Sequence, residues 1–252
     1  MKIGDREVGR IGLGTNRLTR SPANVGFVRA AVEAGVRMID SAHLYSHGES
    51  EQTIGEALSP FSERIVVASK GGFGGAGRGR PEVLRAELEE SLTRLRTDRI
   101  YLYYLHRVDP ETPLEESLDV IKDFQVRGAV AHVGISQVNI EQIERSRKVL
   151  PIAAVQNEYN LTERRSEDVV DYCTREGIPF VPFFPLRGDG GVKLSQVARV
   201  HRATRRQTTL AWLLHRSPVM LPIPGTLSLE HLRENLAAEK IHLSDAEVEA
   251  LR

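Results

Sequence analysis

Short apolar segments alternate with segments of helical periodicity along the whole chain. Eight of each can be placed within the 252 residues, spaced as strand–helix units. This alternation is typical of a parallel sheet covered by helices. Eight units in about 250 residues favour a closed (β/α)8 TIM barrel. No shift in composition marks a linker, so residues 1–252 are predicted to form a single domain. An open doubly wound sheet is the alternative, but it usually has fewer units in this length.

The expected boundaries follow apolar runs, helix caps and glycine stops. Ser21 followed by Pro22 is typical of a helix start, and Gly35 ends that helix. Gly4 and Asp5 predict a turn between two small strands at the N-terminus. Strands are expected at residues 11–14, 36–39, 65–70, 100–105, 130–136, 152–157, 178–184 and 219–223. The expected helices include 49–58, 164–176, 207–216 and 229–238, with a last helix capped by Ser244.

Charge and composition exclude several classes of partner. The chain carries 34 basic and 34 acidic residues, which argues against nucleic acid or a membrane surface as a partner. The short basic stretch at residues 201–206 is interpreted as a solvated loop. No run approaches the roughly 18 apolar residues of a membrane span, and the N-terminus does not resemble a signal peptide. Cys173 has no internal disulfide partner and is expected in the core. A cytoplasmic protein is expected.

Polar side chains stand where three successive strands end. Asp40 ends the second strand, Lys70 the third and His106 the fourth, and Tyr45 follows on a loop. In a barrel these strand ends share one face, where chemistry occurs. An ammonium close to a phenol favours the phenolate, so Lys70 is expected to lower the Tyr45 pKa and make it a better proton donor. Asp40 would keep Lys70 charged.

Each of these residues also has an ordinary structural interpretation. Asp40 could cap a turn, Tyr45 could pack as an aromatic ring, Lys70 could be a surface lysine and His106 a hydrogen-bonded strand-end histidine. All four on neighbouring strand ends by chance is far less expected, so the joint functional interpretation is favoured. A metal-dependent hydrolase using His43, His47 and His106 is a rival. However, no strand end supplies the further histidine–carboxylate pair that it would need.

Other segments suggest a bound ligand rather than acid–base chemistry. The glycine-rich loop at residues 71–77 lacks the lysine–serine pair of a phosphate loop and is interpreted as a flexible active-site loop. The fifth and sixth strands end in neutral polar residues, which suit an amide ligand. A phenylalanine at the end of the seventh strand could stack on a flat ring. The helix that follows residues 224–226 offers an N-terminus to an anion.

Six motifs in this order resemble the aldo-keto reductase superfamily. They are MIDSAHLYSHGESE at residues 38–51, VASK at 67–70, YLYYLHR at 101–107, HVGIS at 132–136, VQNEYN at 155–160, and LPIPGT at 221–226 with HLREN at 231–235. The resemblance runs nearly end to end. It implies a (β/α)8 barrel that reduces aldehydes and ketones with NADPH. It also implies that Tyr45 is the proton donor, that Lys70 lowers its pKa, that Asp40 pairs with Lys70, and that His106 orients the carbonyl.

The resemblance also implies a set of cofactor-binding residues. Three polar residues would hold the nicotinamide carboxamide, Phe183 would stack on the ring, residues 186–188 and Thr226 would approach the phosphates, and the end of the last motif would approach the adenine. The complete set is Gly14, Thr15, Asp40, Ser136, Gln137, Gln156, Phe183, Phe184, Leu186, Arg187, Gly188, Gly225, Thr226, His231, Glu234 and Asn235.

The sequence departs from the family pattern at the cofactor site. The family usually has Asn where this chain has Gln137, and often Tyr where it has Phe183. Many members place cations near residues 225–227 and an arginine at position 231 to bind the adenosine 2′-phosphate. Gly225, Leu227 and His231 offer little fixed charge there. We therefore expect NADPH, with NADH possible, and a more open cofactor site because the loop at residues 187–193 is short.

Further expectations concern the biological role. The expected substrate is a small carbonyl compound, and no resident metal is expected. A nucleotide-binding redox sensor with slow turnover is the alternative function that the sequence leaves open. A monomer is favoured, since the sequence has no strong exposed apolar stripe.

Overall fold

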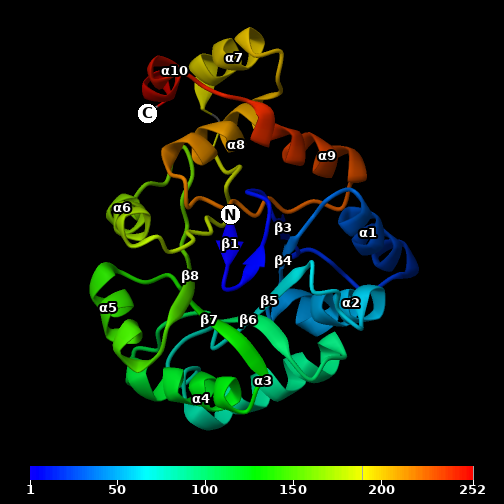
Figure 1. The fold of residues 1–252 in the computed structure, drawn as a ribbon, viewed down its shortest axis with the longest axis vertical. Coiled ribbons are helices and arrows are strands. Elements are labelled where there is room, and N and C mark those ends of the chain that lie inside the picture. Colours follow the sequence, from blue (N-terminus) through cyan, green and yellow to red (C-terminus); the bar gives the residue numbers. More distant parts are fainter. Residues whose placement is uncertain (189, 252) are drawn as a thin grey trace.

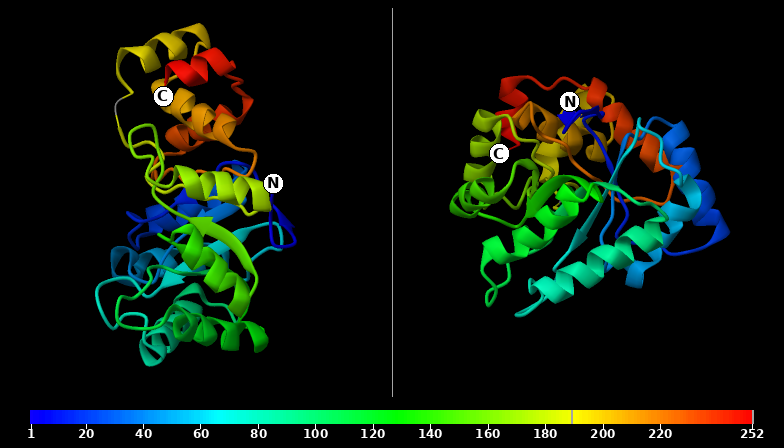
Figure 2. Two further views of the ribbon diagram at one scale, coloured as in Figure 1. Left: turned by 90° about the vertical axis from the view of Figure 1, so that its left-hand side faces the viewer. Right: turned by 60° about the horizontal axis from the view of Figure 1, so that its bottom comes forward.

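The computed structural model describes residues 1–188 and 190–251. Its centre is a six-stranded parallel sheet in sequence order (Figure 1). The strands are β3 (Leu13–Gly14), β4 (Met38–Asp40), β5 (Val66–Gly71), β6 (Ile100–Leu105), β7 (Val130–Ser136) and β8 (Ile152–Gln156). The sheet curls into a half-barrel, and helices lie outside it (Figures 1 and 2).

Two extended segments complete the ring where the seventh and eighth strands were expected. The amide of Val181 donates to the Val155 carbonyl at 2.8 Å, and Phe180 exchanges hydrogen bonds with the segment at residues 219–221. The amide of Gly12 then donates to Pro222 at 2.9 Å. These segments form single bridges rather than ladders. The physical reason is that prolines at 179, 182, 222 and 224 have no N–H to donate.

Helices follow most strands, as the periodicity predicted. In chain order they are α1 (Pro22–Glu33), α2 (Glu49–Leu58), α3 (Pro81–Leu95), α4 (Leu114–Val126), α5 (Ile140–Val149), α6 (Glu167–Glu176), α7 (Gly191–Val200), α8 (Arg205–Arg216), α9 (Leu229–Ala237) and α10 (Asp245–Ala250). Single turns of 3-10 helix, η1 (Tyr45–Gly48) and η2 (Ala238–Lys240), complete the helical segments. Ser21 and Ser244 cap α1 and α10 as expected.

Helices α6, α7 and α8 differ from the sequence-based boundaries, and α6 begins at Glu167 rather than at residue 164. Helix α7 was not predicted, and it occupies part of the segment expected to be a short loop. Asp189, inside that expected loop, lies outside the described residues. The interpretation of residues 201–206 as a solvated loop was wrong for Arg205 and Arg206, which form the first turn of α8. Thr204 and Gln207 cap α8 reciprocally, each side chain bonding to the other's backbone amide, and this starts the helix two residues early.

The interior of the barrel is filled by apolar side chains. A cluster that includes Met38, Val66, Leu102, Tyr104 and Leu221 lies inside the ring, while a larger cluster fills the layer between strands and helices. The predicted N-terminal hairpin, β1 (Lys2–Ile3) and β2 (Arg6–Glu7), covers the N-terminal ends of the strands. The hydroxyl of Tyr101, at the start of β6, donates to the Ile3 carbonyl at 2.9 Å. The opposite end of the barrel is therefore the one open to a ligand.

Among the described residues, every helix is too short or too polar to traverse a bilayer.

Candidate active site

A buried ion pair lies at the C-terminal ends of β4 and β5. The Lys70 ammonium donates to Asp40 Oδ1 at 2.6 Å, to the Ser41 carbonyl at 2.7 Å and to the Tyr45 hydroxyl at 3.4 Å. Lys70 is fully buried and Asp40 is 1% exposed. Gln156, at the end of β8, donates its amide to Asp40 Oδ2 at 2.8 Å. All three ammonium protons and both carboxylate oxygens therefore have partners, as a buried charge pair requires.

Electrostatics keep Lys70 charged. Burial alone would lower the pKa of Lys70, but Asp40 and Tyr45 outweigh burial and the pKa lies above its ordinary value. The parallel register brings the residues together, because Asp40 lies beside Ala68 and Lys70 beside Tyr104. The pairing of Asp40 with Lys70 expected from the strand ends is thus present in the structure.

Tyr45 starts the tight turn that precedes α2. Ser46 and His47 have φ angles of 49° and 55°, in the left-handed region, and turn the chain directly after the tyrosine. The expected lowering of the Tyr45 pKa was wrong for this structure. Burial raises the pKa of Tyr45 above 10.0, and Lys70 opposes this effect without reversing it. The phenol is therefore protonated at neutral pH, with its hydroxyl beside a permanent cation.

His106 follows β6 and is almost completely buried, with a neutral imidazole. Burial, together with Lys70 and Arg107, holds the pKa of His106 well below 6.5. Its Nδ1 is buried and has no hydrogen-bond partner in the part of the chain that the structure describes. The Phe73 ring lies 4.7 Å from the imidazole, between ring centroids. A neutral imidazole carries one N–H, so it can offer a hydrogen bond to an oxygen.

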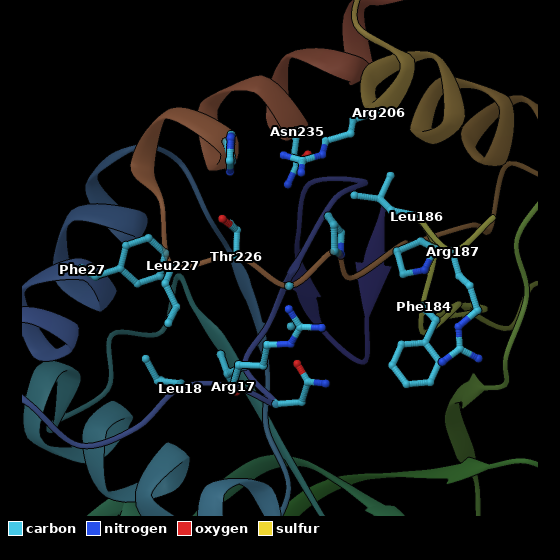
Figure 3. Close-up of a pocket in the computed structure, with 17 residues that line it drawn as sticks. Arg17, Leu18, Phe27, Phe184, Leu186, Arg187, Arg206, Thr226, Leu227 and Asn235 are labelled. Atoms are coloured by element: carbon cyan, nitrogen blue, oxygen red, sulfur yellow. The ribbon is translucent and has the colours of Figure 1, made fainter. Parts of the chain in front are cut away.

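Tyr45 and His106 both line a cavity of about 270 Å³. A second cavity of about 610 Å³ lies beside it (Figure 3). The two share the lining residues Gly14, Thr15, Asn16, Phe184, Pro185 and Gly225. They therefore form one cleft at the C-terminal end of the barrel. We call the first cavity the catalytic end of this cleft and the second the adenosine end, after the roles that the family resemblance implies for their lining residues.

Most residues predicted to bind the cofactor line this cleft. Those that do so are Gly14, Thr15, Asp40, Gln156, Phe183, Phe184, Leu186, Arg187, Gly225, Thr226, His231 and Asn235. Glycine at position 14 leaves room for the opposite wall, since a Cβ there would lie 2.7 Å from the Ile223 carbonyl. The placement of these residues is compatible with cofactor contacts, which stay predictions.

Four other predicted residues do not line either cavity, and three of them have partners elsewhere in the protein. Ser136 accepts a hydrogen bond from Arg107 at 3.2 Å, and Gln137 accepts one from the Glu158 amide at 3.0 Å. Glu234 accepts a hydrogen bond from the Thr204 hydroxyl. Gly188 has a φ of 96° and lies against the Thr162 side chain. To bind the cofactor as predicted, these four residues would have to make contacts that this structure does not contain.

Sequence reasoning missed several residues that line the cleft. Arg107 lines the catalytic end, where its guanidinium carbon lies 5.2 Å from the Phe73 ring and 5.7 Å from the Phe183 ring. Its position directly after His106 was the available signal. Arg17 and Arg206 line the adenosine end. Arg17 lies three residues beyond the end of β3 and Arg206 lies in the first turn of α8, so the pattern of polar strand ends does not mark them.

The glycine-rich loop contributes Phe73 to the catalytic end of the cleft, as expected of an active-site loop. Its backbone is held by buried carboxylates rather than left free. Asp109 accepts from the amides of Gly77 at 3.0 Å and Gly79 at 2.7 Å, and Glu87 accepts from Gly72 at 2.6 Å. These hydrogen bonds hold the loop at both ends, and the flexibility expected of it stays a prediction.

The histidines of the rival metal site lie apart. His43 pairs with Glu90 on α3 at 2.8 Å, and neither His43 nor His47 lines the cavity that contains His106. Within residues 1–188 and 190–251, no three histidine, cysteine or acidic side chains are arranged to hold a metal ion.

Comparisons with known proteins agree with the geometry. A sequence model of the aldo/keto reductase family matches residues 10–193 and 189–252. Pyridoxine 4-dehydrogenase of Escherichia coli is 36% identical over 271 residues, covering 96% of this chain and 93% of that protein. An oxidoreductase of Schizosaccharomyces pombe is 35% identical over 263 residues, covering 97% and 86%.

Solved structures show the same fold. A thermostable aldo-keto reductase bound to the inhibitor epalrestat superposes with a TM-score of 0.90 at 32% identity, covering 98% of this chain and 96% of that one. An aldo/keto reductase of Klebsiella pneumoniae in complex with NADP and acetate gives 0.86 at 29% identity, covering 97% and 90%. The protein described here therefore belongs to the aldo/keto reductase family of NAD(P)H-dependent oxidoreductases.

Proposed function

We propose that this enzyme uses NADPH to reduce a small aldehyde or ketone to an alcohol, with Tyr45 as the proton donor. The observation that carries the proposal is the Lys70 ammonium, which contacts both the Asp40 carboxylate and the Tyr45 hydroxyl while fully buried. A buried lysine held by an acid and directed at a phenol has a clear use in proton transfer. The NADP complex of the Klebsiella relative supports the choice of cofactor.

The residues of the cleft fit a nicotinamide dinucleotide. At the catalytic end, Phe183 offers a flat ring and Gln156 an amide side chain. At the adenosine end, the buried Asn235 has a side-chain oxygen without a partner among the described residues, as expected of a group that awaits a ligand. Bound there, NADPH supplies a hydride to the carbonyl carbon.

The side chains of the catalytic end manage the charge that develops on the substrate oxygen. The neutral His106 donates a hydrogen bond to that oxygen and orients the carbonyl. Tyr45 then transfers its hydroxyl proton to the oxygen, and Lys70 stabilises the phenolate that remains. Asp40 keeps Lys70 protonated and in place. The raised Tyr45 pKa ensures that the donor carries its proton before each turnover.

The walls of the catalytic end favour a compact, flat substrate. Phe73, Phe183, Phe184 and Leu44 make it largely apolar, and Arg107 adds one cation. Such a lining suits an aromatic aldehyde that carries an oxygen or anionic substituent. The E. coli relative, whose name is pyridoxine 4-dehydrogenase, offers a precedent for a flat heteroaromatic substrate.

Substitution Tyr45→Phe tests the function directly. The ring remains while the proton donor is lost, so turnover should fall by about 10²- to 10⁴-fold, the usual contribution of a general acid. NADPH affinity, measured by calorimetry, should change less than about threefold, because the phenol is a proton donor and not a cofactor anchor. Leu44→Ala, which alters a neighbouring wall residue, controls for a change in cavity shape.

The outcomes separate the enzyme from its alternative. Unchanged turnover in Tyr45→Phe would remove Tyr45 from the mechanism. Tight NADPH binding by the wild-type protein, with no reduction across a panel of aromatic and aliphatic aldehydes, would instead favour a nucleotide-binding redox sensor.

A further inference from the structure

The adenosine end of the cleft is rich in arginine, although the positions at which the family usually places cations carry none. Gly225, Leu227 and His231 stand where many family members carry the residues that bind a 2′-phosphate. The same cavity is nevertheless lined by Arg17, Arg187 and Arg206 (Figure 3). None of its lining residues that the structure describes is acidic. The missing charge is therefore supplied from other elements of the fold.

The three arginines differ in how much of their charge is available. Arg187 is already paired, since it donates to Glu158 at 2.6 Å and stacks 4.0 Å from the Phe184 ring. Arg17 and Arg206 are exposed, and neither has a carboxylate partner within the described residues. Two guanidinium groups are thus free to bind phosphate, which they do with paired, charge-assisted hydrogen bonds.

The backbone at Arg206 is held close to the part of α9 that carries Asn235. Its neighbours Thr204 and Gln207 both bond to Glu234 on α9, Thr204 to the carboxylate and Gln207 to the backbone carbonyl at 3.1 Å. These contacts clamp the first turn of α8 onto α9. Figure 3 shows the Arg206 and Asn235 side chains directed toward one another from the two helices. Glu234, predicted to approach the adenine, acts in this structure as the clamp.

Asn235 gives this corner a second, independent indication of a ligand. The side chain is 2% exposed and lines the cavity, yet its Oδ1 accepts no hydrogen bond from the described residues. An amide oxygen left in this state suits an N–H donor, such as the exocyclic amine of adenine. An adenine held by Asn235 would share this cavity with Arg206.

We propose that Arg206 is the residue that recognises the adenosine 2′-phosphate and gives this enzyme its preference for NADPH. The inference rests on the proposed cofactor cleft. In Rossmann folds, an acidic residue binds the ribose 2′-hydroxyl of NAD, whereas an arginine accommodates the 2′-phosphate of NADP, and the same charge logic applies here. The adenosine end has the arginine and lacks the acid. In this protein, the choice between NADPH and NADH would therefore depend on the first turn of α8, and not on the loop after residue 224 or on position 231.

The test measures binding of NADPH and NADH by calorimetry to the wild-type protein and to Arg206→Ala. Loss of charge-assisted hydrogen bonds should weaken NADPH by about 10- to 100-fold, with NADH changed less than about threefold. The fragments 2′,5′-ADP and 5′-AMP, which differ by the 2′-phosphate, should show the same contrast without any dependence on turnover. Circular dichroism checks that the variant is folded.

Two matched variants make the test specific. Arg17→Ala removes the other unpaired arginine of the same cavity, and it should reduce the ratio of NADPH to NADH affinity less than Arg206→Ala does. Arg233→Ala removes an exposed arginine of α9 that does not line the cavity, and it should change neither affinity.

The results distinguish a wrong residue from a wrong function. If the wild-type protein binds both nucleotides and Arg206→Ala keeps the wild-type affinity ratio, the reductase assignment stands and the role of Arg206 is refuted. A larger loss of selectivity in Arg17→Ala or Arg233→Ala would also refute it. If the wild-type protein binds neither nucleotide nor either fragment, the proposed function itself fails, and the inference with it.

Discussion

The two ends of the cleft are built in opposite ways. At the catalytic end, the charged groups of Asp40 and Lys70 are buried and bonded to each other and to Gln156. At the adenosine end, Arg17 and Arg206 are exposed, and the described residues offer them no carboxylate. The buried pair at the catalytic end has its electrostatic partners within the protein, whereas Arg17 and Arg206 at the adenosine end are left for a ligand, and of the arginines there only Arg187 is paired among the described residues.

This difference suits the roles proposed for the two ends. Proton transfer depends on groups held in place before the substrate arrives, and buried, fully bonded pairs on strand ends provide this. Recognition of a phosphate depends on the ligand to complete the ion pairs, so free arginines on helix termini and loops are suitable. The predictions below separate the two ends.

The largest effect is expected from Lys70→Met. The substitution leaves the Asp40 carboxylate buried with only the Gln156 amide as a charge-neutral partner. Breaking a buried pair in this way typically costs about 3–5 kcal/mol of unfolding free energy. Turnover should fall by about 10²-fold or more, because the phenolate of Tyr45 loses its cation. Urea denaturation and steady-state kinetics measure the two effects.

The double variant Asp40→Asn with Lys70→Met is the control for this prediction. It removes both charges and should recover part of the lost stability, while turnover stays low. Equal stability of the single and double variants would show that the ion pair is not what organises the catalytic end.

Six strands of the barrel could be predicted from the sequence because each is a short, mainly apolar run that alternates with a segment of helical periodicity. The run at residues 100–105 became β6 with the expected boundaries. The last two strand positions were also located correctly, but proline residues reduced them to single bridges. Helix α7 was missed because a loop was expected after the seventh strand, and its start at Gly190 and Gly191 offers no capping side chain.

The catalytic end could be predicted because residues at the ends of successive strands lie close together in a parallel barrel. Asp40, Lys70 and His106 end successive strands, so their proximity follows from the parallel register. Arg206 could not be found in this way, since its place beside Asn235 depends on how α8 packs on α9. The sequence could not predict whether the Tyr45 pKa is raised or lowered. The degree of burial decides the direction of this shift, and no pattern in the sequence reports burial that precisely.

Salt should affect the two ends differently. The Debye length falls from about 30 Å at 0.01 M to about 3 Å at 1 M ionic strength, and exposed charges are screened far more than buried ones. NADPH binding should therefore weaken about three- to tenfold across this range, and more than NADH binding. Turnover at saturating cofactor should stay nearly constant, because the pair of Asp40 and Lys70 is shielded from the solvent. Stopped-flow hydride transfer and calorimetry in the same buffers measure both quantities. A parallel decline of turnover and NADPH affinity would contradict the contrast.

The smallest effect should be that of pH on the catalytic end. The pKa of His106 lies well below 6.5, so the imidazole is neutral through the physiological range, and the Tyr45 pKa lies above 10.0, so the phenol keeps its proton. Turnover in the reductive direction at saturating NADPH should therefore vary less than about twofold between about pH 6 and pH 8.

NADPH affinity at the adenosine end should change over the same pH range, because a phosphate monoester takes up its second proton at about pH 6. A ligand phosphate held by Arg206 loses part of its charge as the pH falls, so NADPH affinity should weaken by about twofold at pH 6 while NADH affinity stays level. A fall in turnover centred near 6.5 would show instead that His106 titrates as an ordinary histidine. The catalytic end would then be more open to water than its burial indicates, and the contrast between the two ends would rest on the arginines alone.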